Sequence, residues 1–197
     1  SATGAVILGV LASLSLVRFG KFRGRSLFSG LVSAPLVMPE VITGISLLLL
    51  FISLEQLIGW PAGRGLLTIT IAHITFGTAF VIVVVQPRLA TKDQSLEEAS
   101  RDLGAGPVST FFLVTLPVVA PAIISAWLLA FILSFDDLVI ASFTAGPGST
   151  TLPMLIFSKV KIAVSPDVNA LATLIILGVA IMLIFALLLR RTDTNNS

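Results

Sequence analysis

The sequence contains no cysteine, a single histidine and few charged residues. The absence of cysteine excludes disulfides and thiolate metal ligands, and one histidine is too few for a metal centre built from protein ligands alone. We therefore predict neither a metal site nor a catalytic residue. Charged residues make up 11% of the chain, against about 25% in soluble domains. So small a share cannot cover a water-exposed surface, which excludes an ordinary soluble globular protein.

Hydrophobic residues account for 56% of the 197 residues, and the mean hydropathy is +1.07. This composition predicts an integral membrane protein, an all-α, polytopic membrane helix bundle. A spanning helix needs about 20 apolar residues, and the chain has about five such runs, the second of them interrupted by Pro35, Pro39 and Glu40. The runs cover about residues 2–17, 27–54, 66–85, 117–135 and 170–189. Because the first run is short and the chain begins without Met, we expect a chain truncated at its N-terminus.

Lysine and arginine are divided unevenly between the loops on the two sides. Nine of the 12 follow the first, third and fifth runs: Arg18, Lys21, Arg23, Arg25, Arg88, Lys92, Arg101, Arg190 and Arg191. Three lie on the other side: Arg64, Lys159 and Lys161. Positively charged loops stay in the cytoplasm, so residues 95–117 are predicted to be cytoplasmic and the turn-rich stretch over 136–168 to face the opposite side. Within that stretch, TLPMLIFSKV is predicted to form an interfacial or re-entrant helix.

The longest polar interruption between apolar runs, Ser95–Pro117, contains signals for the start and end of helices. Ser95 and Glu98 have the spacing of a capping box, in which each side chain binds a free backbone N–H group. Gly104 is placed to end the helix in a left-handed conformation, and Pro107 to begin the next one. Three apolar residues share one face of the first helix: Leu96, Ala99 and Leu103. We therefore predict a short amphipathic helix, a sharp turn, and a second helix that returns to the membrane.

A spaced motif runs through the same stretch. Its members are Glu98, Ala99, Ser100, Gly104, Val114, Leu116 and Pro117. It resembles the EAA loop of permease subunits of binding-protein-dependent ATP-binding-cassette importers, whose pattern is E-A-A, three residues, Gly, nine residues, Ile, one residue, Leu-Pro. Ser100 replaces the third residue of E-A-A, and Val114 replaces Ile. Stretches from Ala34 and from Ser134 resemble the polyamine branch of that family, and the putrescine permeases within it, so that the resemblance covers essentially the whole chain.

The resemblance implies a fold and a function. The chain would be a single type I importer transmembrane domain over residues 1–197, with a coupling-helix loop over about residues 91–115. Members of the family usually have six spans, so we expect the first span to be missing here. The function implied is that of a permease subunit forming the path for polyamines, with putrescine favoured and spermidine left open. The chain would not be an enzyme.

The resemblance also implies partners. These are a paralogous permease subunit, two copies of a cytoplasmic ATPase, a periplasmic polyamine-binding protein and the lipid of the bacterial inner membrane, without nucleic acid. The sequence contains no Walker A motif, so ATP and magnesium are expected on the ATPase, with no cofactor bound by this chain. An alternative function is an ion-gradient-driven secondary transporter or channel for a small cation, which would have no need of a cytoplasmic helical loop.

In the family, the short helix of the EAA loop inserts into a cleft of the ATPase. We therefore assign the following residues to ATPase coupling: Leu96, Glu98, Ala99, Ser100, Arg101, Gly104, Leu116 and Pro117. Glu98, together with either Arg101 or Asp102, is expected to pair with charges on the ATPase. The alternative for Glu98 is that it only caps its own helix.

Acidic residues near apolar runs form a second candidate site. Charges at membrane depth are costly and usually face a cavity or a partner, and a diammonium substrate needs carboxylates and aromatic rings. We assign Glu40, Asp136 and Asp137, with Trp127 and Phe135, to the substrate path. The alternatives are that Asp136 and Asp137 are solvated or contact a partner protein, and that Glu40 lies in water at the start of its span.

Smaller polar and glycine positions within the apolar runs have simpler interpretations. His73 lies within the third run beside several threonines, and a polar contact between packed helices is its expected role. Gly44 and Gly77 are expected to allow two helices to approach closely.

Overall fold

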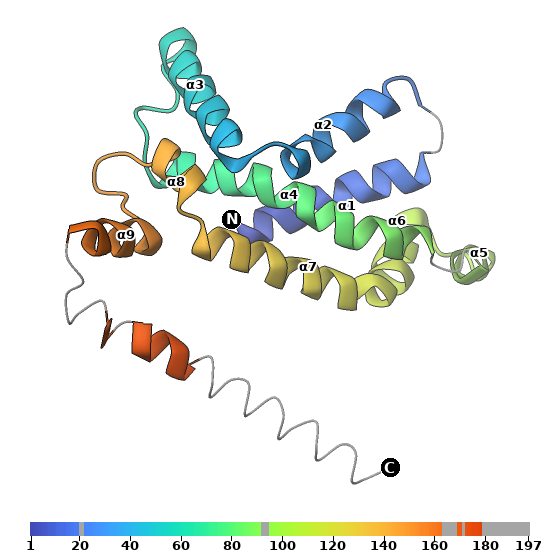
Figure 1. Cartoon of the computed structure of the whole chain (residues 1–197). Helices are drawn as coiled ribbons and strands as arrows, with labels where there is room; N and C mark the ends of the chain where they lie inside the picture. The colour runs from blue at the N-terminus through green and yellow to red at the C-terminus, as the bar shows by residue number, and fades with distance from the viewer. Residues whose placement is uncertain (20–21, 92–94, 163–168, 171, 179–197) are drawn as a thin grey trace. The chain divides into compact units, whose positions relative to one another are not determined.

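The computed structural model describes residues 1–19, 22–91, 95–162, 169–170 and 172–178, and all regular structure within these ranges is helical (Figure 1). This agrees with the predicted all-α class. The chain divides into two compact units, Ser1–Thr151 and Leu152–Ser197. The first unit contains every candidate site residue.

Three helices form the core of the first unit: α1 (Ala2–Arg18), α4 (Leu66–Ala90) and α7 (Leu116–Asp136). Each packs against the other two (Figure 1). Small residues let the backbones approach closely, because a Cβ atom added to Gly77 would lie 3.1 Å from the Cβ of Ala5. The prediction of a close helix approach at Gly77 is therefore confirmed.

The predicted second run, over about 27–54, is divided into two helices, α2 (Arg25–Val37) and α3 (Glu40–Ile58). The break falls at Met38, whose ψ of 135° is extended, because the ring of Pro39 disfavours helical geometry in the residue before it. Pro35, by contrast, lies inside α2 without ending it. The expected start of the spanning helix at Leu27 was therefore wrong, since the long apolar helix begins at Glu40.

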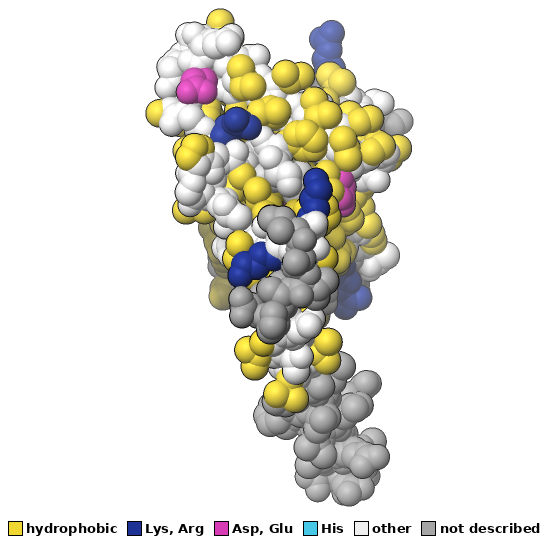
Figure 2. All heavy atoms as spheres, turned by 60° about the vertical axis from the view of Figure 1, so that its left-hand side comes forward, with side chains coloured by type: hydrophobic (Ala, Val, Ile, Leu, Met, Phe, Trp, Pro, Cys, Tyr) yellow, Lys and Arg dark blue, Asp and Glu magenta, His cyan; other side chains and the backbone are white. Residues whose placement is uncertain are grey.

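Three helices among the described residues are long and apolar enough to cross a membrane: α3, α4 and the continuous helix Pro107–Asp136. The first predicted run corresponds to α1, a shorter apolar helix of 17 residues. The fifth predicted run, over about 170–189, lies mostly outside the described residues. Hydrophobic side chains are spread over the face seen in Figure 2, and charged ones are few. A surface of this kind suits contact with lipid or with another apolar surface.

The helix Pro107–Asp136 contains a wide turn. It begins as α6 (Pro107–Thr110), passes through the π-helical segment η1 (Phe111–Thr115), and continues as α7. The N–H of Leu116 donates to the carbonyl of Phe111, five residues earlier. Pro117 follows directly. Because proline has no N–H and its ring clashes with the carbonyl four residues before it, it disfavours a regular α-turn at this point.

A short helix, α8 (Val139–Thr144), follows α7 and packs on α3 and α4. An added Cβ at Gly44 would lie 2.6 Å from the ring of Phe143, so the predicted close approach at Gly44 is confirmed, with α8 as the neighbour. Thr68, at the start of α4, donates from Oγ1 to the carbonyl of Thr144 at 2.7 Å. These contacts hold α8 against the end of the bundle opposite α5 (Ser95–Asp102) (Figure 1).

The second unit contains α9 (Leu152–Ile162), which covers nearly all of the segment predicted as an interfacial or re-entrant helix. Its helical structure is confirmed. Residues 172–178 are also helical, in agreement with the first part of the predicted fifth run.

Candidate functional site

The α5 helix, Ser95–Asp102, lies at one end of the bundle, beyond α6 (Figure 1). Its predicted apolar face is open, because Leu96 is 47% and Leu103 is 89% exposed, and Ala99 is exposed as well. Glu98 is also exposed. The face assigned to ATPase coupling is therefore accessible in the isolated chain.

A tight turn connects α5 to α6, as the sequence predicted. Gly104 has a φ of +85°, in the left-handed region that glycine adopts without a steric penalty. Its N–H donates to the carbonyl of Arg101 at 2.8 Å, and the N–H of Ala105 donates to the carbonyl of Ser100 at 3.1 Å. This pair of hydrogen bonds is a Schellman motif, and Pro107 then begins α6. The turn fixes the direction in which α5 leaves the bundle.

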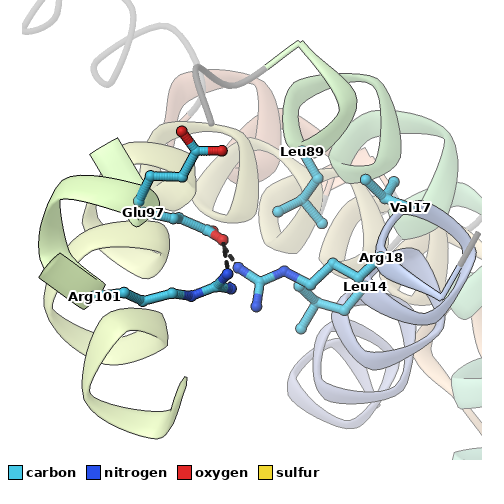
Figure 3. Close-up of a pocket in the computed structure, with 7 residues that line it drawn as sticks. Leu14, Val17, Arg18, Leu89, Glu97 and Arg101 are labelled. Atoms are coloured by element: carbon cyan, nitrogen blue, oxygen red, sulfur yellow. Dashed lines mark hydrogen bonds and ion pairs between the residues drawn. The ribbon is translucent and has the colours of Figure 1, made fainter. Parts of the chain in front are cut away.

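The opposite side of α5 faces the bundle through Glu97, whose side chain is 13% exposed. It forms an ion pair with Arg18 at the end of α1 (Figure 3). Its Oε1 also accepts a hydrogen bond from the hydroxyl of Thr115 at 2.5 Å. Arg18 in turn donates to Thr115 Oγ1 at 3.1 Å, so that three side chains from α5, α1 and η1 contact one another pairwise. Arg101 approaches Glu97 from the next turn of α5, at 3.7 Å.

A second contact, between Ser100 and Thr110, lies beside the first. Their hydroxyl oxygens are 3.2 Å apart, and both Thr110 and Thr115 are at most 1% exposed. Residues five apart do not share a face in a regular α-helix, which has 3.6 residues per turn. The wider turn of η1 brings Thr110 and Thr115 to the same side, where each binds α5.

The remaining predicted coupling residues lie away from the exposed face of α5. Leu116 is half-buried at the start of α7, and Pro117 follows it next to the π-turn. Because both residues lie next to the π-turn, we infer that they shape the helix Pro107–Asp136 rather than the exposed face of α5. Sequence reasoning missed Arg18, Glu97, Thr110 and Thr115 as site residues. The one local signal was the spacing of Glu97 and Arg101, which suits an i,i+4 ion pair.

At the opposite end of the bundle, the side chain of Asp137 is buried, with 7% of it exposed. Its carboxylate lies 3.0 Å from Nε2 of His73 and accepts the N–H groups of Ile140 at 3.1 Å and Ala141 at 2.7 Å. Burial raises the pKa of Asp137, but the hydrogen bonds from His73 and from the two backbone donors outweigh it. The pKa therefore lies below its ordinary value of 3.8.

His73 lies between two partners from the end of α7. Its Nδ1 is 2.8 Å from the hydroxyl of Ser134, while Nε2 binds Asp137. His73 is buried, with its side chain 6% exposed. The prediction of a polar contact between packed helices is confirmed for His73.

The other substrate-path candidates are exposed. Glu40 lies in the first turn of α3, and Asp136 ends α7. Trp127 and Phe135 belong to a row of stacked rings with Phe131 between them, with centroid separations of 5.4 and 5.9 Å. The three rings line a hollow beside the start of α1. The structure thus brings the aromatic candidates together. Asp137 differs from the other candidates, because the Asp137 carboxylate already binds protein groups.

Residues 5–194 match the model of the family described as binding-protein-dependent transport system inner membrane component. The chain is 62% identical over 182 residues to the putrescine transport system permease protein PotI of Escherichia coli K12, which covers 92% of this chain and 65% of PotI. It is 38% identical over 197 residues to the spermidine/putrescine transport system permease protein PotC of the same strain, covering 100% of this chain and 72% of PotC. PotC of Haemophilus influenzae is also 38% identical, over 194 residues. The chain thus spans slightly less than two thirds of the length of PotI.

Proposed function

The chain belongs to the family of binding-protein-dependent transport system inner membrane components, and from this we propose that it is a permease subunit of an ATP-driven polyamine importer. It forms part of the translocation path in the bacterial inner membrane and crosses that membrane several times. Chemical energy comes from a separate ATPase, which holds ATP and magnesium. The chain itself catalyses no reaction.

One observation carries this proposal: α5 presents an apolar face to solvent at the end of the bundle. Leu96 and Leu103 lie on that face, and Glu98 is exposed on the same helix. Exposed leucines on a short polar helix are costly in water and are typical of a surface that a partner covers. A helix docked in a groove by one apolar face is a common mode of recognition. The partner we propose for this face is the ATPase, with Glu98 paired to one of its basic residues.

Putrescine is the substrate that we propose. The support is that the relative with 62% identity is named for putrescine transport, whereas the relatives with 38% identity are named for both spermidine and putrescine. The assembly would also contain a paralogous permease, a second ATPase copy and a periplasmic binding protein. Competition between labelled putrescine and unlabelled spermidine, measured in the full assembly, distinguishes the two substrates.

The test uses the chain reconstituted with its partner subunits in proteoliposomes. We expect the ATPase to co-purify with the permease and labelled putrescine uptake to require ATP and to be inhibited by vanadate. The substitution Glu98→Arg is expected to release the ATPase while the chain still inserts in the membrane. Uptake that is driven by an ion gradient and is insensitive to vanadate would contradict the proposal and favour a secondary transporter.

A further inference from the structure

The side of α5 that faces away from the proposed ATPase is attached to the membrane helices by side chains. We propose that Arg18, Glu97 and Thr115 form a joint that passes movement of α5 to α1 and α7, with Glu97 as its positioning residue. This inference rests on the proposed function and assigns a role to residues outside the face that contacts the ATPase. We call these three residues the α5 joint.

The α5 joint is closed, because each member contacts the other two. Glu97 forms the ion pair with Arg18 and accepts the hydroxyl proton of Thr115, and Arg18 also donates to Thr115 Oγ1. Glu97 lies in α5, Arg18 is the last residue of α1, and Thr115 is the last residue of η1, directly before α7. A displacement of α5 therefore pulls on two helices of the three-helix core through one carboxylate.

Burial makes this contact strong in comparison with a surface ion pair. The side chain of Glu97 is 13% exposed and Thr115 is fully buried. Apolar side chains of Leu14, Val17 and Leu89 line the pocket that contains Arg18 and Glu97 (Figure 3). In such surroundings a carboxylate interacts more strongly with its partners, and removing one partner leaves a costly buried charge. The geometry thus favours α5 and the ends of α1 and α7 moving together.

The α5 joint acts alongside the covalent connection on this side of α5. The turn from α5 to α6 contains Gly104 and Gly106, and a Cβ added to either would meet no atom within 4 Å. Glycine has more backbone freedom than any other residue. The side-chain contacts of the α5 joint therefore reinforce the turn in holding α5 against η1 and the start of α7.

Glu97 and Glu98 are adjacent, yet they have different environments. Glu98 lines the same pocket as Glu97 but is exposed, and it belongs to the proposed ATPase contact, whereas Glu97 binds α1 and η1. This predicts two separable defects. Loss of Glu98 should weaken ATPase binding, and loss of Glu97 should leave binding intact but reduce the transport obtained for each ATP hydrolysed.

The experiment measures three quantities in the reconstituted assembly: ATPase retained on the permease, ATP hydrolysed, and labelled putrescine taken up. For Glu97→Gln and Arg18→Gln we expect normal ATPase retention, continued hydrolysis, and uptake per ATP lower by about tenfold, within the usual range of coupling between sites. The double variant Arg18→Glu/Glu97→Arg should recover part of the loss. Arg23→Gln is the matched control for Arg18, because Arg23 is exposed at the same end of the chain, and it should behave as wild type.

Two results would overturn the inference. One is unchanged uptake per ATP in both Glu97→Gln and Arg18→Gln. The other is loss of ATPase retention in Glu97→Gln to the same extent as in Glu98→Arg, which would place Glu97 in the docking contact. If the wild-type assembly retained no ATPase, the proposed function would fail instead.

A spectroscopic measurement tests the α5 joint independently of transport. The chain has no native cysteine, so Leu11→Cys on α1 and Leu103→Cys after α5, both exposed positions, can be spin-labelled in the permease alone. We expect a narrow distance distribution that broadens with Glu97→Gln and stays narrow with Glu98→Gln. An identical distribution in the Glu97→Gln variant would contradict the α5 joint whatever the transport result.

Discussion

At the scale of single residues, Asp137 holds together three segments at the end of α7. Its carboxylate binds His73 on α4 and the first free N–H groups of α8. We expect Asp137→Asn to lower the free energy of unfolding by about 2 kcal/mol, since hydrogen bonds to a charged group are worth more than neutral ones. The midpoint of thermal unfolding in detergent measures the effect. Asp136→Asn is the matched control, because Asp136 is adjacent and exposed, and it should change the midpoint little.

The contribution of Asp137 should also depend on pH in a defined direction. Its pKa in the folded chain lies below the ordinary 3.8, so near that pH the folded chain binds fewer protons than the unfolded chain, and stability falls as the pH falls. The stabilisation is present above 3.8 and is lost as the pH drops through the folded pKa. The difference in midpoint between wild type and Asp137→Asn should therefore be present from neutral pH to about pH 5 and shrink below about pH 4. A difference that disappeared already between neutral pH and pH 5 would contradict this assignment.

Glu97 and Glu98 show which site residues could be predicted from the sequence and which could not. The motif spacing assigned Glu98, Gly104 and their neighbours to ATPase coupling, which stays a prediction, and helix periodicity indicated which face of α5 is apolar. Neither pattern could identify Glu97, because the partner Arg18 is 79 positions away in the sequence. In the sequence Arg18 is one of several basic residues after an apolar run, and only the packing of α1 beside α4 and α7 brings it to α5.

At the scale of elements, the turn between α5 and α6 depends on the left-handed conformation of Gly104. A side chain there costs about 1 kcal/mol or more in this conformation, least for Asn. We expect Gly104→Val to redirect α5 and to reduce ATP-dependent uptake strongly while the chain still inserts. Gly104→Asn is the matched control and should retain most of the activity. Both variants are compared by uptake and by the amount of chain in the membrane fraction.

If Gly104→Asn and Gly104→Val were equally impaired, backbone strain would not be the cause. Since no atom lies within 4 Å of the added Cβ, the remaining explanation would be that the partner approaches the glycine itself. If both variants had normal activity, the direction of α5 would not matter for ATP-dependent uptake.

Local chemistry determined some of the helix boundaries in this chain but not others. Gly104 and Pro107 marked the turn correctly, because each acts on its own backbone. Proline was harder to interpret: Pro39 separates α2 from α3, Pro35 lies within α2, and Pro117 follows a π-turn without ending its helix. A proline excludes one hydrogen bond, and the surrounding packing decides whether the helix ends, continues or widens.

At the scale of the whole molecule, the charge bias predicts which side of the membrane each end of the bundle faces. The structure places α5 and the end of α1 at one end and α8 at the other (Figure 1). Because the chain has no cysteine, single cysteines at exposed positions can report this topology. We expect Leu103→Cys to react with a membrane-impermeant maleimide in inverted vesicles but not in intact spheroplasts, and Thr150→Cys, which follows α8 at an exposed position, to show the reverse. Labelling of both positions from the same side would contradict the predicted orientation.

The general architecture could be predicted because apolar composition and charge bias act along the whole chain. They indicated a helical membrane protein, the course of α1 and α4, and a helical loop between two apolar runs. They did not reveal that Asp137 is engaged by His73, since that contact joins α4 to the end of α7. For the substrate path the sequence suggested three equivalent carboxylates, whereas the structure leaves Glu40 and Asp136 exposed and gives Asp137 protein partners.

That difference sharpens the prediction for the substrate path. A dication is attracted by carboxylates that have no stronger partner, and an exposed ion pair is worth up to about 1 kcal/mol, or about fivefold in affinity. We expect Glu40→Gln and Asp136→Asn each to raise the apparent KM for putrescine by up to about fivefold with little change in stability.

Asp137→Asn should act mainly through stability, so that its uptake returns towards wild type at lower temperature. Uptake of labelled putrescine at several concentrations, with thermal midpoints of the same preparations, separates the two effects. If neutralising all three carboxylates left both KM and the maximal rate unchanged, none of them would line the path, and the stacked rings of Trp127 and Phe135 would be the next side chains to test for contact with the cation.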